Sequence, residues 1–344
     1  MPLKLTSGRA AAGSSGRLLF AAAALLFALT FTAQARQAAG ARQRITTGAN
    51  VRVRSSPDTT AGEVARLQLG TVVEELERSQ EKALVGASED FWYMVSAPGG
   101  ARGWVFGALT APFDAARREE IYARLASERA SKTDATFSDA SELVRFAERA
   151  AKEVQGRGAR AELEFARLRA LARSLTFLTS GQPSEEPFKQ WAAEHESEIA
   201  YSEPSGEWYV RADLLWDLQA KYKELPLAER VAWEAAQTPL PGECEGDLSC
   251  NMYYLSVTNG RYVKLYPRGA HAAEALKGLE ELVNAVVEDS RSPSPVYEVP
   301  PGSDIEFKNL LATLRSQLTP AASPAATRIL KQLDAIARLS SSRR

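Results

Sequence analysis

Residues 45–109 read ITTGANVRVRSSPDTTAGEVARLQLGTVVEELERSQEKALVGASEDFWYMVSAPGGARGWVFGAL, and this stretch decides the fold of the N-terminal part of the chain. Apolar and polar side chains alternate in residues 50–54, as they do in a half-buried strand, and Ser55-Ser56-Pro57 then interrupts the pattern. Further short strands are expected at residues 64–67, 72–76, 92–95 and 103–107. Because turn-forming residues separate these strands, the stretch predicts a small all-β module.

Four motifs of this stretch together resemble a known family. They are residues 50–57, Leu69-Gly70-Thr71, Trp92-Tyr93 and Gly103-Trp104-Val105. In this order they are similar to the bacterial SH3-like domain. The resemblance implies an SH3-like β-barrel at residues 44–112 that recognises a ligand outside the cytoplasm, and it does not name the ligand.

Four aromatic residues are the candidate core and binding residues of the barrel: Trp92, Tyr93, Trp104 and Phe106. Successive side chains of a strand point to opposite faces of the sheet, so one member of each pair is expected inside and the other outside. We assign Trp92 and Trp104 to the barrel core. Tyr93 and Phe106 are then the predicted ligand-binding residues of an exposed groove, because large rigid aromatic rings suit peptides or sugars.

The first 35 residues have the order of a secretory signal. They contain basic residues but no acidic ones, followed by an apolar run at residues 18–31 that ends with Ala33-Gln34-Ala35. This pattern predicts a signal peptide at residues 1–35, a short linker at residues 36–43, and export to the periplasm or beyond. A retained membrane anchor is the alternative, although the run is shorter than the roughly 20 residues that a spanning helix needs. No later stretch approaches that length, so no stable transmembrane segment is expected after cleavage.

The charge of the chain argues against one class of partner. Removal of residues 1–35 takes away Lys4, Arg9 and Arg17 and no acidic residue, so the formal charge falls from -1 to -4. A weakly acidic chain offers no electrostatic basis for nucleic-acid binding. The content of 45% hydrophobic and 25% charged residues is that of an ordinary globular protein and argues against long disordered segments.

The two cysteines, Cys244 and Cys250, are close in sequence. In an exported protein an even number of cysteines with a short intervening loop predicts a disulfide bond, with two free thiols as the alternative. A structural zinc site is not expected, because it needs four ligands and no histidine lies near Cys244.

Beyond Pro112 the pattern changes to a helical period, which predicts an irregular α-helical domain at residues 113–289. Helices are expected, among others, at residues 185–199 and 205–224. Residues 290–302, rich in proline and serine, are expected to form a linker or loop, and residues 303–340 a C-terminal helical hairpin.

Within the helical domain, residues 262–276 are similar to the junction of tetratricopeptide-like helical pairs in bacterial envelope proteins. No clear 34-residue repeat accompanies this junction, so a regular solenoid is not predicted.

The inventory of reactive side chains argues against catalysis. The chain has two histidines, and His271 falls on the helix that follows Cys250, with no strand to present it to a nucleophile. His195 is interpreted as a solvated residue at a helix end. Phosphate-binding and nucleophile-elbow motifs do not occur in the sequence. We therefore expect no catalytic residue, no metal and no cofactor.

The sequence as a whole predicts an exported, non-enzymatic protein of the cell envelope. Its SH3-like domain is expected to recognise peptidoglycan or a protein partner, and its helical domain to act as a scaffold. The alternative is a cell-wall hydrolase with a carboxylate site in the helical domain, because 43 acidic residues offer many pairs and spacing alone selects none.

Overall fold

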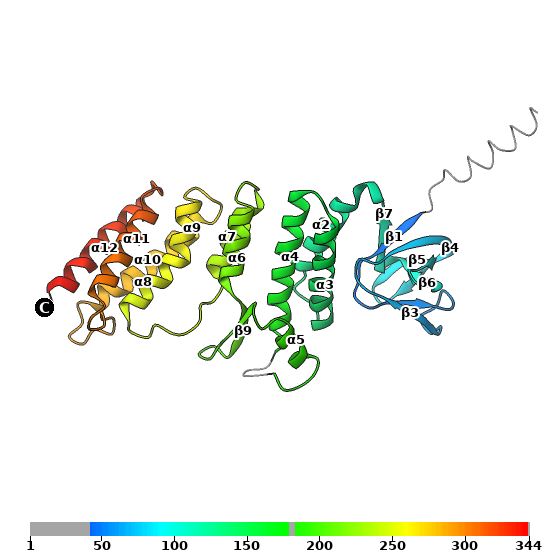
Figure 1. Cartoon of the computed structure of the whole chain (residues 1–344), viewed down its shortest axis with the longest axis horizontal. Helices are drawn as coiled ribbons and strands as arrows, with labels where there is room; N and C mark the ends of the chain where they lie inside the picture. The colour runs from blue at the N-terminus through cyan, green and yellow to red at the C-terminus, as the bar shows by residue number, and fades with distance from the viewer. Residues whose placement is uncertain (1–41, 179–182, 343–344) are drawn as a thin grey trace, which may run out of the picture.

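The computed structural model describes residues 42–178 and 183–342, which form a β-barrel followed by a row of helices (Figure 1). The barrel and the helices follow one another along the long axis of the molecule, with α12 at the end opposite the barrel. The predicted signal peptide lies outside the described residues. The predicted fold class, an SH3-like barrel sheet followed by a mostly helical region, is confirmed.

Seven antiparallel strands form the barrel sheet in the order β3-β2-β6-β5-β4-β1-β7. Their bounds are β1 Gln43–Thr46, β2 Val51–Arg54, β3 Glu63–Leu67, β4 Val72–Val85, β5 Ser88–Ser96, β6 Arg102–Phe106 and β7 Thr110–Phe113. The inward-pointing apolar side chains of these strands form the barrel core, which contains Val51, Val53, Leu67, Val73, Tyr93, Val95, Ala97 and Val105. The alternation seen in the sequence therefore corresponds to an inner and an outer face of one sheet.

Two glycines allow β6 to pass close to its neighbours. A Cβ atom on Gly103 would lie 2.5 Å from the backbone oxygen of Arg54, and one on Gly107 would lie 2.7 Å from the backbone oxygen of Phe91. Only a residue without a side chain fits at such distances. The sequence Gly103-Trp104-Val105-Phe106-Gly107 thus fixes the position of the aromatic strand between β2 and β5.

The helical region contains eleven α-helices in the described residues, with a two-stranded hairpin among them. The barrel is joined to it through two short 3₁₀ helices, η1 Gly107–Leu109 before β7 and η2 Ala115–Arg117 after it. The remaining elements are α2 Arg118–Ala130, α3 Phe137–Glu153, α4 Arg157–Leu175, α5 Phe188–Glu194, β8 Ile199–Ser202, β9 Glu207–Val210, α6 Ala212–Lys221, α7 Leu227–Gln237, α8 Leu248–Val257, α9 Asn259–Leu265, α10 Ala272–Asp289, α11 Asp304–Leu318 and α12 Pro324–Ser342.

The β8–β9 hairpin corrects the sequence-based prediction, which placed helices at residues 185–199 and 205–224. The strands pair from Ile199 opposite Val210 to Ser202 opposite Glu207. Ile199 and Val210 are both buried in the helical core, and Gly206 has a positive φ of 67° in the turn. Burial against the neighbouring helices, which no local pattern reports, outweighs the helical tendency of this short segment.

The barrel is packed firmly on the helices. Ile45, Leu69 and Phe113 of the barrel belong to the same hydrophobic core as α2, α3 and α4. The carboxylate of Glu142 on α3 accepts hydrogen bonds from the backbone N–H groups of Asn50 and Leu69, each at 3.0 Å. The helical region therefore holds the outer side of β1 and β7. It also holds the two turns that contain Asn50 and Leu69.

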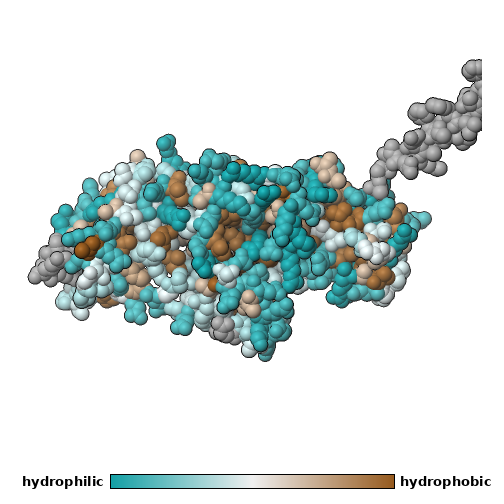
Figure 2. All heavy atoms as spheres, viewed as in Figure 1, coloured by the Kyte–Doolittle hydropathy of each residue, from teal (hydrophilic) through white to brown (hydrophobic). Residues whose placement is uncertain are grey.

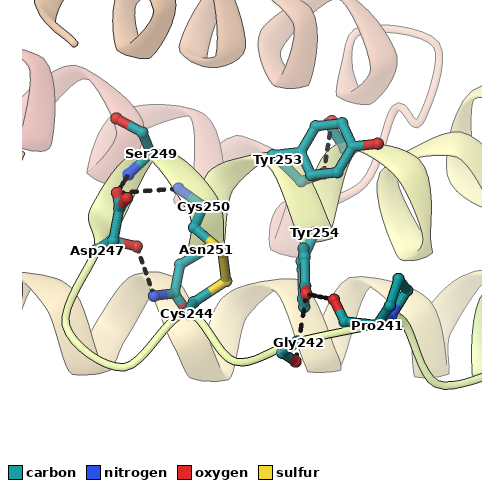
Figure 3. The surroundings of a disulfide bond; sticks show 10 residues. Pro241, Gly242, Cys244, Asp247, Ser249, Cys250, Asn251, Tyr253 and Tyr254 are labelled. Carbon is teal, nitrogen blue, oxygen red and sulfur yellow. Dashed lines mark hydrogen bonds between the residues drawn. A yellow bond between two sulfur atoms is a disulfide. The ribbon is translucent and has the colours of Figure 1, made fainter. Parts of the chain in front are cut away.

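The disulfide joins the loop before α8 to the first turn of that helix (Figure 3). Cys244 and Cys250 are bonded, as predicted, and their Cα atoms are 5.3 Å apart. Between them, Asp247 caps α8 by accepting hydrogen bonds from the backbone N–H groups of Ser249 and Cys250. An isolated bridge joins Asp247 to Glu298. The proline-rich segment at residues 290–302 is thus a loop that contacts the disulfide loop.

Within residues 42–178 and 183–342, no helix combines the length and the apolar character needed to cross a membrane.

Candidate functional site

Tyr93 lies inside the barrel, so the prediction that it lines an exposed groove is wrong. Its side chain is 9% exposed and belongs to the barrel core. The guanidinium of Arg44 covers the ring at 3.6 Å from its centroid. Arg44 itself donates a hydrogen bond to Thr110 at 2.8 Å and forms an ion pair with Glu75 at 3.3 Å. A satisfied arginine thus closes the barrel over Tyr93, which explains why this tyrosine is buried.

Phe106 is also buried, which corrects the second predicted groove residue. Phe106 and Trp92 are paired across β5 and β6, and their ring centroids are 5.5 Å apart. Each is 4% exposed. Two large rings on directly opposed residues cover each other, because paired residues of neighbouring strands project from the same face. The expected burial of Trp92 agrees with the structure, although Trp92 packs on the outer side of the sheet and not in the barrel core.

Trp104 is the aromatic residue that reaches the surface. Its side chain is half-buried, whereas the sequence placed it in the core. It is opposed by Met94 on β5 and by Arg54 on β2, so all three side chains project from the same face of the sheet. We call Arg54, Met94 and Trp104 the Trp104 face. The prediction failed because alternation identifies residues that share a face but does not tell which face is covered.

The Trp104 face contains one arginine, and a second arginine lies beside it. Arg54 is half-buried and donates a hydrogen bond to the backbone oxygen of Ala61 at 2.7 Å, which holds its guanidinium beside the sheet. Arg102 is exposed and lies two residues before Trp104, on the same side of β6. Figure 2 shows brown, apolar residues at the surface of the barrel end among hydrophilic ones. Chemically, the face combines an aromatic ring, a flexible thioether and one fixed cation, with the cation of Arg102 beside it.

The other candidate chemistry is dispersed over the helical region. Cys250 is bonded to Cys244, and the ring of His271 stacks on Trp233 with centroids 4.4 Å apart. His195 is 7% exposed and contacts Glu198 at 2.8 Å, so its interpretation as a solvated residue is wrong. In the part of the chain that the structure describes, no group of three or more potential ligands is placed to hold a metal ion.

Comparison with known proteins identifies the barrel. Residues 49–111 match the family model of the bacterial SH3 domain, a family whose members typically bind the cell wall. Searches of curated proteins and of solved structures each found no match. The chain therefore carries a bacterial SH3 domain at residues 49–111, followed by a largely helical region.

Proposed function

We propose that this protein is an exported, non-enzymatic binding protein of the cell envelope. Its SH3 domain binds peptidoglycan or an envelope protein through the Trp104 face, and its helical region serves as a scaffold. The observation that carries the proposal is a half-exposed tryptophan held between Arg54 and Met94 on a strand that Gly103 and Gly107 fix in place.

The chemistry of the face suits such a ligand. A tryptophan ring offers a rigid apolar surface to sugar rings or peptide side chains. Arginine donates paired hydrogen bonds to carboxylates, which acidic peptides carry. Because Arg54 is already held by Ala61, little conformational freedom is lost when a ligand binds.

The proposed location rests on two features. The order of residues in the 1–35 segment is that of an export signal. The bond between Cys244 and Cys250 is typical of an oxidising compartment. The non-enzymatic assignment is supported by the use of both cysteines in this bond and of both histidines in packing contacts.

The experiment that tests the proposal is co-sedimentation of the mature protein with purified sacculi, with an envelope extract as a second bait. Trp104→Ala is expected to weaken binding about fivefold or more, because loss of a central aromatic residue of an interface typically costs about 1 kcal/mol or more. Leu84→Ala is the matched control, since Leu84 is 73% exposed at the distal end of β4.

Two results would contradict the proposal. Equal binding of Trp104→Ala and wild type to both baits would exclude the Trp104 face. Release of soluble muropeptides from the sacculi by the wild-type protein would instead identify the chain as a cell-wall hydrolase.

A further inference from the structure

A pocket of about 200 Å³ lies in the helical region, between α4, β9, α6 and α7. It is distant in sequence from the SH3 domain and takes no part in the proposed function. Its volume is below the ~300–1,000 Å³ of pockets that hold drug-sized ligands, so it is suited to a ligand with one apolar side chain. The apolar walls include Leu168, Val210 and Leu215.

Tyr209 lines this pocket, and its buried hydroxyl has no partner within the described residues. Tyr209 is 7% exposed, and its hydroxyl makes no hydrogen bond to any group within the described residues. Burial raises the pKa of Tyr209, so the hydroxyl is a neutral donor at neutral pH. This oxygen has almost no accessible surface, so a ligand in the pocket contacts the ring of Tyr209 and not its hydroxyl.

Two opposite charges from different helices also line the pocket. Arg169 on α4 and Glu234 on α7 are both half-buried. Neither forms an ion pair within the part of the chain that the structure describes. Arg169 lies over the ring of Phe165, and the backbone oxygen of Glu234 accepts a hydrogen bond from the hydroxyl of Thr238.

The neighbouring charges behave differently. Arg167, also on α4, pairs with Glu148 and with Glu198, each at 2.7 Å. Lys221 pairs with Glu164 at 2.6 Å. The half-buried Arg167 and Glu164 are thus compensated, whereas the pocket leaves a cation and an anion to an external partner.

We propose that this pocket binds a free α-amino acid with an apolar side chain. The ligand ammonium faces Glu234, the ligand carboxylate faces Arg169, and the side chain contacts the apolar walls. The ring of Tyr209 belongs to the apolar walls. The two charges of a zwitterion can pair with Arg169 and Glu234 at the same time. A neutral apolar ligand would leave both of these side chains without a partner of opposite charge.

Calorimetry on the full mature chain tests the proposal with three probes: L-leucine, N-acetyl-L-leucine, which lacks the ammonium charge, and L-leucinamide, which lacks the carboxylate. L-leucine is expected to bind, and each derivative to bind at least tenfold more weakly. Absence of L-leucine binding at millimolar concentration would overturn the proposal. So would a derivative that binds as tightly as L-leucine.

Variants assign the binding to the pocket. Arg169→Gln and Glu234→Gln are expected to weaken L-leucine binding at least tenfold, whereas Arg291→Gln and Glu306→Gln, at exposed positions on the far part of the helical region, leave it unchanged. Tyr209→Phe keeps the ring and removes only the inaccessible hydroxyl, so this variant is expected to bind L-leucine as tightly as wild type. Unchanged binding in Arg169→Gln and Glu234→Gln would refute the site, and retained thermal stability shows that a loss of binding is not a loss of folding.

Discussion

Replacement of Glu198 by glutamine is expected to remove much of the acid-sensitive stability of the helical region. One oxygen of Glu198 contacts both Nδ1 of His195 at 2.8 Å and Nη2 of Arg167 at 2.7 Å. The hydrogen bond from His195, followed by the hydrogen bond and charge of Arg167, lowers the pKa of Glu198 to about 2, against the opposing effect of burial. These contacts tie α4 to α5 and to the start of the β8–β9 hairpin.

The magnitude follows from the lowered pKa. From the ordinary value of 4.5 to about 2, at about 1.4 kcal/mol per unit, the carboxylate contributes at most about 3–4 kcal/mol. The side chain is 22% exposed, so solvent screening reduces this value and we expect about 2 kcal/mol. Because the pKa is lowered in the folded state, the contribution is fully present above the unfolded pKa and is lost as the pH falls from about 4.5 towards 2.

The assay is urea denaturation followed by far-UV circular dichroism across this pH range. Glu198→Gln is expected to unfold more easily than wild type at neutral pH, and the difference is expected to shrink as the solution is acidified. Glu128→Gln is the matched control, because Glu128 is 65% exposed and pairs with Arg124 at 3.8 Å. A difference between wild type and Glu198→Gln that stays constant from neutral pH to pH 3 would refute the reasoning.

Two further predictions concern the barrel and its attachment. Gly103→Ala is expected to destabilise the barrel by about 1–3 kcal/mol, because the new Cβ meets the backbone oxygen of Arg54 at 2.5 Å. Gly158→Ala is the control and is expected to be tolerated, because no atom lies within 4 Å of the new Cβ. An unchanged denaturation midpoint for Gly103→Ala would contradict the packing described for β6. Glu142→Ala removes two hydrogen bonds of 3.0 Å between α3 and the turns of the barrel, and we expect a loss of about 2 kcal/mol and faster hydrogen exchange in those turns. Unaltered exchange in this variant would show that the carboxylate does not hold the barrel.

The strands of the barrel were predictable because their signals are local. Alternation in residues 50–54 and the turns at Gly70 and Gly99, both with positive φ, are properties of neighbouring residues. The covering of each face is not local. Tyr93 is covered by Arg44 from β1, and Trp92 by Phe106 from β6, so the assignment of aromatic residues to core and groove required the assembled sheet.

The pocket in the helical region was missed for a related reason. Arg169, Tyr209 and Glu234 stand on α4, β9 and α7, and no short motif joins them. The sequence predicts a helix where the strand that carries Tyr209 lies. Four residues are too few for the alternation of a strand to be distinguished from the helical pattern that follows it. A cluster of unpaired side chains becomes visible only when the partners of each charge are known.

The attachment of the barrel constrains the proposed scaffold role. Phe113, the last residue of β7, is buried in the core that continues through the helices. A second contact is at Gly70, which has a positive φ; a Cβ atom on this residue would lie 2.2 Å from the ring of Phe146 on α3. An SH3 domain on a flexible linker leaves its ligand free to adopt many positions relative to the rest of the chain. Here the barrel continues into the helical core, so a ligand on the Trp104 face is held in one orientation relative to the row of helices in Figure 1. The helical region then positions whatever the barrel binds, and loosening of the joint through Glu142 is expected to impair that positioning without weakening the binding itself.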